Sequence, residues 1–214
     1  DSCFIVAFPS GMFNTWNIGP EAMFSHDIDD NSYVSALIDT IVSNYPIDTN
    51  RVYGTGHSMG GAFTNHLLCN STEFTATGSS GGWFNSNYDP GTQYSHLCDP
   101  TTNGYVTPSI HTHGGLDETI PVQWGKHAAF ASSAKNHCDE PHQYYYSLDW
   151  ELYSYYAEVD LETFDFVLDD FFAAADTIVY GGGIEHYRWS NGCHTEPNTE
   201  MILLPGVSHA WHQT

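Results

Sequence analysis

The apolar residues of this chain fall into short runs that alternate with amphipathic stretches. The first run, Cys3 to Pro9 (CFIVAFP), is continuous, which is typical of a parallel strand buried on both faces. Further along, five apolar residues recur at helical spacing: Val34, Leu37, Ile38, Ile41 and Val42. The pattern therefore predicts a strand followed by a helix, with Asp30 as its N-cap and Pro46 as its stop.

The same alternation continues to the end of the sequence. It predicts helices over 60–68 and 121–136, and strands over 51–57, 74–80, 105–113, 186–190 and 200–206. Strands that alternate with helices indicate the α/β class, with a mostly parallel sheet and helices on both of its faces. A chain of 214 residues suits one domain, 1–214, with a large core.

A nucleophile motif lies where one of these strands passes into a helix. Residues Gly56-His57-Ser58-Met59-Gly60 have the pattern G-x-S-x-G. We expect small residues at Gly56 and Gly60 because the chain turns sharply there and the helix packs close to the strand, and Gly61 should allow further close approach. The turn lifts the Ser58 hydroxyl above the carboxyl edge of the sheet. The backbone N–H of Met59 would then lie at a helix N-terminus, where an oxyanion is stabilised. The alternative interpretation is an ordinary serine in a glycine-rich turn.

A serine hydroxyl is a weak nucleophile and needs a base. In this fold the expected chain order is serine, acid, histidine. Asp117 follows one predicted strand and His209 follows the last one, so both should reach the edge that carries Ser58. Asp117 would hold the His209 ring in the correct tautomer. Glu118 is the competing acid, and His212 is the competing base.

Aromatic side chains flank the same edge. Trp16, Trp83 and Trp211 fall in predicted loops near it, and loops at that edge build the site in open α/β sheets. Together with His57, these residues are our predicted substrate contacts, because tryptophan offers a large flat surface to an aromatic or polymeric acyl group. The alternative for each tryptophan is an ordinary place in the core.

Two further histidines raise the question of a metal. His111 and His113 alternate on one predicted strand and so share a face, but the nearby sequence offers no clear third ligand. We therefore expect no metal site, and a serine mechanism needs no cofactor.

The charge balance limits the partners. Four Lys and Arg residues face 26 Asp and Glu residues, giving a formal charge of -22. Nucleic acid and anionic membranes are therefore unlikely partners, whereas a neutral polymer or small ester would not be repelled. The apolar run at the start lacks a basic leader and a cleavage site, so we interpret it as a buried strand rather than a signal peptide.

The five cysteines, Cys3, Cys69, Cys98, Cys138 and Cys193, contain no C-x-x-C spacing, which argues against a zinc site. Few lysines, many Asn, Ser and Thr residues, and a glycosylation-type sequon over 70–72 favour a secreted protein. Two disulfides and one odd thiol would fit that interpretation. Buried free thiols in a cytosolic protein are the alternative.

Several segments together resemble a known group of enzymes. Residues 4–17, 29–67, 111–125 and 187–212 are similar to the polyhydroxybutyrate depolymerase and feruloyl esterase (LpqC-like) family of α/β-hydrolases. The resemblance implies secreted hydrolysis of polyester, feruloyl or acetyl esters, with Ser58, Asp117 and His209 as the triad. It also implies disulfides Cys138–Cys193 and Cys69–Cys98, with Cys3 unpaired.

The chain departs from the family pattern in three places. It begins at a strand that is normally central and stops soon after His209. We therefore expect an α/β-hydrolase fold that lacks the usual N-terminal strands, the His-Gly oxyanion loop and the C-terminal helix. An acidic, aromatic insertion over 142–183 is predicted to be either a helix packed on the core or a lid beside the ester pocket.

The sequence thus predicts a secreted serine carboxylic-ester hydrolase. Two other hypotheses remain open. One is a truncated, weakly active or inactive relative that serves as a binding protein, and the other is a serine peptidase on the same fold. Turnover of esters and peptides, with Ser58→Ala as control, discriminates among the three.

Overall fold

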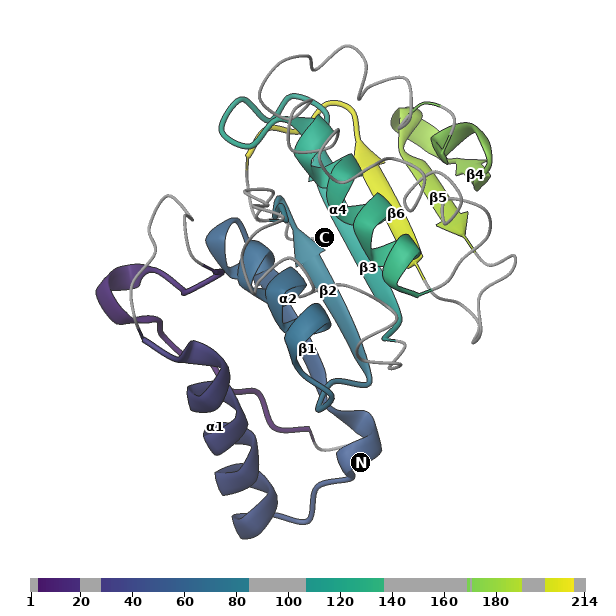
Figure 1. Ribbon diagram of the computed structural model, residues 1–214. Coiled ribbons are helices and arrows are strands. Elements are labelled where there is room, and N and C mark those ends of the chain that lie inside the picture. The colour runs from purple at the N-terminus through teal and green to yellow at the C-terminus, as the bar shows by residue number, and fades with distance from the viewer. Residues whose placement is uncertain are drawn as a thin grey trace.

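The computed structural model describes residues 4–19, 28–84, 107–136, 169, 171–189 and 199–209. Its centre is a six-stranded sheet with the strand order β1-β2-β3-β6-β5-β4 (Figure 1). The strands are β1 (Tyr53–His57), β2 (Ala76–Ser80), β3 (Ser109–Gly114), β4 (Asp176–Val179), β5 (Glu185–Trp189) and β6 (Thr199–Leu204). The helices are α1 (Asp30–Asn44), α2 (Met59–Asn70) and α4 (Val122–Lys135), with short 3₁₀ turns η1 (Met12–Asn14), η2 (Thr49–Arg51) and η3 (Gly181–Gly183).

The first four strands in spatial order are parallel. His57 of β1 pairs with Ser80 of β2, and β3 runs parallel to both β2 and β6. Their carboxyl ends therefore meet at one edge of the sheet, as the alternating pattern predicted. The α/β class and the mostly parallel sheet are confirmed.

The remaining two strands run the other way. β5 is antiparallel to β6, and β4 is antiparallel to β5. The turn between β4 and β5 contains Gly182 and Gly183 at positive φ, which glycine adopts without steric cost. β4 was not predicted, because its four residues lie within the 142–183 insertion and are all exposed, so they carry no buried-strand pattern.

The predicted strand over Cys3 to Pro9 is wrong for the residues described. Residues 4–9 belong to no strand, and the side chains of Phe4 and Phe8 are 82% and 89% exposed. A continuous apolar run indicates a preference for burial, but a strand also needs a neighbour for its backbone hydrogen bonds. Among the described residues none pairs with the free side of β1, so this segment has no ladder to join.

The first predicted helix is confirmed, but its cap shifts by one residue. Asp29 caps α1, because its Oδ1 accepts a hydrogen bond of 2.9 Å from the Ser32 N–H. Asp30 is buried inside the first turn, where its Oδ2 accepts a 2.6 Å bond from the Asn17 N–H. The helix ends at Asn44, two residues before Pro46, as expected.

Two helices cover the sheet on the side that faces the viewer in Figure 1. α2 packs against β1 and β2, and α4 packs against β3 and β6. α1 joins α2 through a cluster of buried residues that includes Val34, Ala62, Phe63 and Leu67. This cluster supports the turn at the start of α2.

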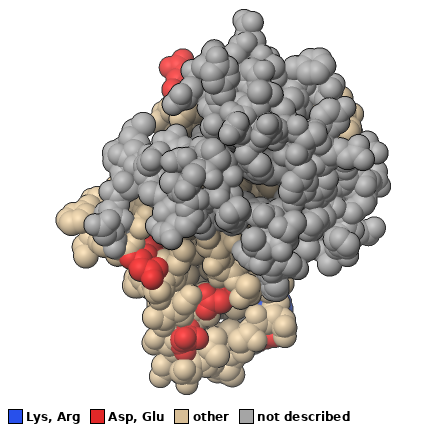
Figure 2. Space-filling view, viewed as in Figure 1, with Lys and Arg blue, Asp and Glu red and all other residues tan. Residues whose placement is uncertain are grey.

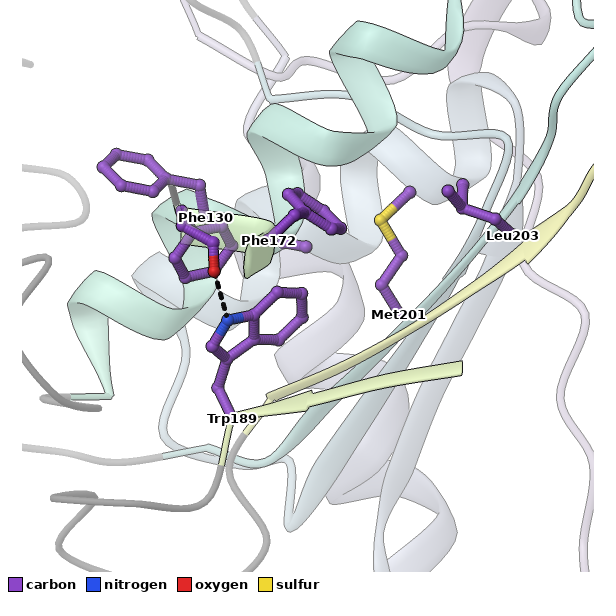
Figure 3. Close-up of a cluster of buried hydrophobic side chains, with 7 residues drawn as sticks. Phe130, Phe172, Trp189, Met201 and Leu203 are labelled. Carbon is purple, nitrogen blue, oxygen red and sulfur yellow. Dashed lines mark hydrogen bonds between the residues drawn. The ribbon is translucent and has the colours of Figure 1, made fainter. Parts of the chain in front are cut away.

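The second core cluster lies between α4 and the antiparallel end of the sheet (Figure 3). Phe171 stacks on Trp189 with ring centroids 4.2 Å apart, and the Trp189 indole N–H donates to the Phe171 carbonyl oxygen at 3.1 Å. Phe130 of α4 meets the Phe171 ring edge-on at 5.1 Å. The described end of the 142–183 segment, Phe171 and Phe172, is therefore core, and residues 142–168 lie outside the described part.

Among the described residues on the face shown in Figure 2, the acidic side chains lie apart from one another. Within the described ranges, no helix combines the length and the apolar character that crossing a membrane requires.

Candidate active site

Ser58 occupies the turn between β1 and α2 and has an unusual backbone conformation. Its φ of 54° and ψ of -121° are disfavoured for a residue with a Cβ atom. Two hydrogen bonds hold the strained peptide. The Ser58 N–H donates to the Ser80 carbonyl at 2.9 Å, and the Ser58 carbonyl accepts from the Ala62 N–H at 2.9 Å. The surrounding strand and helix therefore impose the turn that presents the hydroxyl.

The two motif glycines are not equally required. A Cβ atom at Gly56 would overlap the backbone carbonyl of Gly60, so only glycine fits there. A Cβ atom at Gly60 would meet nothing within 4 Å. The expected need for a small residue is therefore met at Gly56, whereas the space beside Gly60 does not require one. The close approach expected at Gly61 is confirmed, because a Cβ there would come within 3.0 Å of the Gly82 Cα.

The loops that carry Asp117 and His209 lie against each other at the carboxyl edge of the sheet. Asp117 follows β3 and His209 follows β6, its parallel neighbour. The Leu116 N–H donates to the Val207 carbonyl at 2.9 Å. A Cβ atom at Gly114 would overlap the same carbonyl, so the missing side chain lets the loops approach.

The structure brings Ser58, Asp117 and His209 together in one hydrogen-bonded chain. His209 Nε2 lies 2.9 Å from the Ser58 Oγ, and His209 Nδ1 lies 2.6 Å from the Asp117 Oδ2. A carboxylate only accepts hydrogen bonds, so Nδ1 carries the proton and Nε2 of the neutral ring accepts from the serine hydroxyl. The competing acid Glu118 is exposed. The competing base His212 lies outside the described residues.

Asp117 is buried and surrounded by hydrogen-bond donors. Its Oδ1 accepts from the backbone N–H groups of Thr119 at 2.9 Å and Ile120 at 2.8 Å. Burial raises the pKa of this carboxyl, but the Ile120 N–H, His209 and the Thr119 N–H lower it by more. The net pKa lies below the ordinary value of 3.8, so Asp117 is an anion at neutral pH.

Met59 is the first residue of α2, directly after Ser58. The first N–H groups of a helix have no partner within the helix, and the helix dipole makes this end positive. The Met59 N–H is therefore placed as the sequence predicted for an oxyanion donor. Its catalytic role stays a prediction.

The four predicted substrate contacts, His57, Trp16, Trp83 and Trp211, do not share one position. The His57 ring lies 4.9 Å from the His209 ring, measured between centroids, and so adjoins the triad. Trp16 stacks on Phe63 at 4.5 Å within the α1–α2 cluster, which gives it a place in the core. Trp211 lies outside the described residues.

Trp83 has a partner that the sequence interpretation missed. It packs against the α1–α2 cluster, as Met59 also does, and its ring centroid lies 6.4 Å from that of Trp124. Trp124 is 43% exposed and lies in the first turn of α4, just after the Asp117 loop. The sequence did place Trp124 shortly after the Asp117 loop, and this position could have indicated that it lies near the site.

The other expectations concern cysteines and metal. Cys69 is buried in α2 and disulfide-bonded. Cys98, Cys138, Cys193 and Cys3 lie outside the described residues, so the predicted pairings stay predictions. His111 and His113 both face the interior, the first beside Ser132 Oγ at 3.0 Å and the second beside the Ile120 carbonyl at 2.8 Å. In the described ranges no three His, Cys, Asp or Glu side chains gather as metal ligands would.

Comparison with known proteins finds two related esterases by sequence, while no protein-family model matches. The chain is 40% identical over 67 residues to the bifunctional acetylxylan esterase/xylanase XynS20E of Neocallimastix patriciarum, which is 30% of this chain and 9% of that protein. It is 36% identical over 76 residues to feruloyl esterase B of Piromyces equi, 34% of this chain and 14% of that protein. The chain thus spans a small part of these relatives.

A solved structure extends the likeness to most of the chain. The acetyl xylan esterase from Aspergillus awamori superposes with a TM-score of 0.54 and 17% identity, over 91% of this chain and 68% of that one. An identity this low shows the fold alone. The chain therefore has the α/β-hydrolase fold and, over about a third of its length, is similar in sequence to feruloyl and acetylxylan esterases.

Proposed function

We propose that this chain is a carboxylic-ester hydrolase that works through an acyl-enzyme on Ser58. The observation that carries the proposal is the continuous hydrogen-bonded chain from Asp117 through His209 to Ser58, on a strained turn at the start of a helix. The sequence similarity to acetylxylan and feruloyl esterases supports the same reaction class.

In the first half of the reaction, Ser58 Oγ attacks the ester carbonyl carbon while its proton moves to His209 Nε2. The carbonyl oxygen becomes an oxyanion near the Met59 N–H. The positive charge on the His209 ring is stabilised by the Asp117 carboxylate, 2.6 Å from Nδ1. When the tetrahedral intermediate collapses, the bond to the alkoxy oxygen breaks, and His209 gives its proton to that oxygen to release the alcohol.

The second half repeats these steps with water. His209 Nε2 takes a proton from a water molecule as its oxygen attacks the acyl carbon. The acid is released, and the proton returns to Ser58 Oγ. The residues supply nucleophile, base and oxyanion stabilisation, and water is the only co-reactant that the balance requires.

The proposed substrates are acetyl or feruloyl esters, after the relatives that the chain resembles. A formal charge of -22 would not repel a neutral ester or an uncharged polysaccharide. Polyesters remain a further candidate from the sequence resemblance alone. We also propose secretion, which the sequon over 70–72 and the disulfide at Cys69 support.

Ester turnover tests the proposal. The unmodified chain should hydrolyse p-nitrophenyl acetate and methyl ferulate, and Ser58→Ala should abolish this activity, a loss on the order of a millionfold where a full triad operates. Ser35→Ala is the matched control. That serine lies on α1 and bonds Glu73, so its loss should leave turnover unchanged. Equal turnover by Ser58→Ala would refute the assignment, and tight ester binding without turnover would favour the binding-protein alternative.

A further inference from the structure

His113 is a buried histidine beside the triad that the proposed mechanism does not use. It belongs to β3, and its Nε2 lies 2.8 Å from the Ile120 carbonyl oxygen and 3.5 Å from the Asp117 Oδ2. The side chains of His113 and Asp117 are each 1% exposed, so water cannot readily replace either contact.

The hydrogen bond to Ile120 fixes the protonation of this ring. A carbonyl oxygen only accepts, so His113 Nε2 must carry the proton. Burial lowers the pKa of His113 by more than the Ile120 carbonyl and Asp117 raise it. The ring is therefore neutral at pH 7 and presents an N–H group, rather than a full positive charge, to the turn that holds Asp117.

The Ile120 peptide connects the two side chains. Its carbonyl accepts from His113, while its N–H donates to the Asp117 Oδ1 at 2.8 Å. The other oxygen, Oδ2, accepts a hydrogen bond from His209 Nδ1 at 2.6 Å. His113 Nε2 lies 3.5 Å from the same oxygen. A shift of the His113 ring would thus move the turn that aims the carboxylate at His209.

The helix that follows holds the His113 ring in place. A Cβ atom at Gly125 of α4 would overlap the His113 Nδ1, so the ring lies directly against the helix backbone. β3 on one side and α4 on the other leave the imidazole little freedom to rotate.

We propose that His113 is a positioning residue that fixes the Asp117 carboxylate against His209. The inference rests on the proposed function for its catalytic consequence, but not for its geometry. His113 touches no reacting atom and acts only through Asp117. Its effect on turnover should therefore disappear once Asp117 can no longer orient His209.

A double-mutant cycle tests this dependence. His113→Leu should lower kcat for p-nitrophenyl acetate by about a hundredfold or less, as a small misplacement of a catalytic group does, with KM changed less than about threefold. In an Asp117→Asn background the same substitution should cost less than about twofold. His113→Gln, which retains an N–H donor, should recover most of the loss. His111→Leu, the matched buried histidine two residues earlier, should lower the melting temperature without this kcat loss.

A second readout does not depend on activity. The Nδ1 proton of His209, shared with Asp117, should give a far-downfield proton signal in NMR spectra, assigned by its absence in His209→Ala. His113→Leu should weaken or shift this signal, and His111→Leu should not. An unchanged signal in His113→Leu, or an equal kcat loss with and without Asp117, would overturn the positioning role. A changed signal in a chain without esterase activity would instead leave the positioning intact and refute the proposed function.

Discussion

At the scale of single residues, the fold holds the groups of the candidate site in fixed positions, with little conformational freedom. Ser58 holds a backbone conformation that a free chain would avoid, and Asp117 is buried with both carboxylate oxygens occupied. Such preorganisation costs stability during folding. In the proposed reaction it would lower the barrier, because little reorganisation remains.

Trp83 and Trp124 lead to a prediction about substrate choice. Their ring centroids lie 6.4 Å apart, Trp83 packs against the same cluster as Met59, and Trp124 is 43% exposed. If they form a wall for the acyl group, Trp124→Ala should lower kcat/KM for methyl ferulate about tenfold, the value of one aromatic pair, and change that for p-nitrophenyl acetate much less.

Parallel rate measurements on the two esters, with melting temperatures, check this prediction. An equal fall on both esters that follows a lower melting temperature would mean that Trp124 supports the fold and does not select the acyl group. Phe130→Leu, a core change in the same helix, is the control for such a general effect.

The hydrogen-bonded arrangement of Ser58, Asp117 and His209 could be predicted from the sequence because it follows from the topology of the sheet. The G-x-S-x-G motif over 56–60 needs a strand before it and a helix after it. Asp117 and His209 had to follow strands that end at the same edge of the sheet. The Trp83–Trp124 pair and the role of His113 could not be predicted, because they depend on side-chain packing between elements. Trp124 belongs to a helix whose faces are not separated by polarity in the sequence.

At the scale of elements, the glycines in the turn between β1 and α2 differ in how much space the structure leaves for a side chain. Gly56 is enclosed by the Gly60 carbonyl, whereas Gly60 itself opens into free space. Gly61 carries the close contact with the loop after β2. The sequence motif alone does not reveal this difference, since it depends on where the helix backbone lies relative to the strand.

Two alanine variants test that difference. Gly60→Ala should retain activity and leave the free energy of unfolding unchanged or raised by up to about 1 kcal/mol, because alanine favours the helix. Gly56→Ala should lower the free energy of unfolding by about 1–3 kcal/mol, as overpacking does, and should reduce kcat. Urea denaturation and ester turnover measure both. Similar losses in the two variants would show that the turn in solution differs from the one described.

At the scale of the whole molecule, the sheet joins two separate clusters of core residues. One links α1 to α2 beside the nucleophile, and the other links α4 to β5 and β6 through Phe171 and Trp189. The alternation of strand and helix patterns predicted the four parallel strands, although β1 (YGTGH) and β2 (ATGSS) contain few apolar residues. It missed β4, whose four residues are all exposed, and it wrongly predicted a strand over 4–9, because polarity alone does not supply a strand with a neighbour.

Three histidines make the fold sensitive to acid, of which His111 is buried and His66 and His127 are half-buried. Burial lowers the pKa of His111 to about 3 and those of His66 and His127 to about 4, from an ordinary value of 6.5. Below pH 6.5 these histidines therefore bind protons in the unfolded chain but remain neutral in the folded chain. Stability falls with decreasing pH, by up to about 1.4 kcal/mol per pH unit for each histidine, until the folded pKa is reached.

Urea denaturation between pH 7 and pH 4.5 measures this loss. His111→Leu should show a shallower fall than the unmodified chain, by about 1.4 kcal/mol per pH unit at most, because one proton-binding difference is gone. Equal slopes would mean that His111 titrates in the folded chain, and that its burial is less complete than described.

The central claim is that Ser58 forms an acyl-enzyme with His209 as its base, and covalent labelling tests it most directly. Intact-mass and peptide mass spectrometry after reaction with a p-nitrophenyl phosphonate ester should find one phosphonyl group, on the peptide that contains Ser58. Ser58→Ala should remain unlabelled, and His209→Ala should be labelled at least about a hundredfold more slowly, because the general base is lost. Labelling at another residue, or equal labelling of Ser58 without His209, would contradict the account.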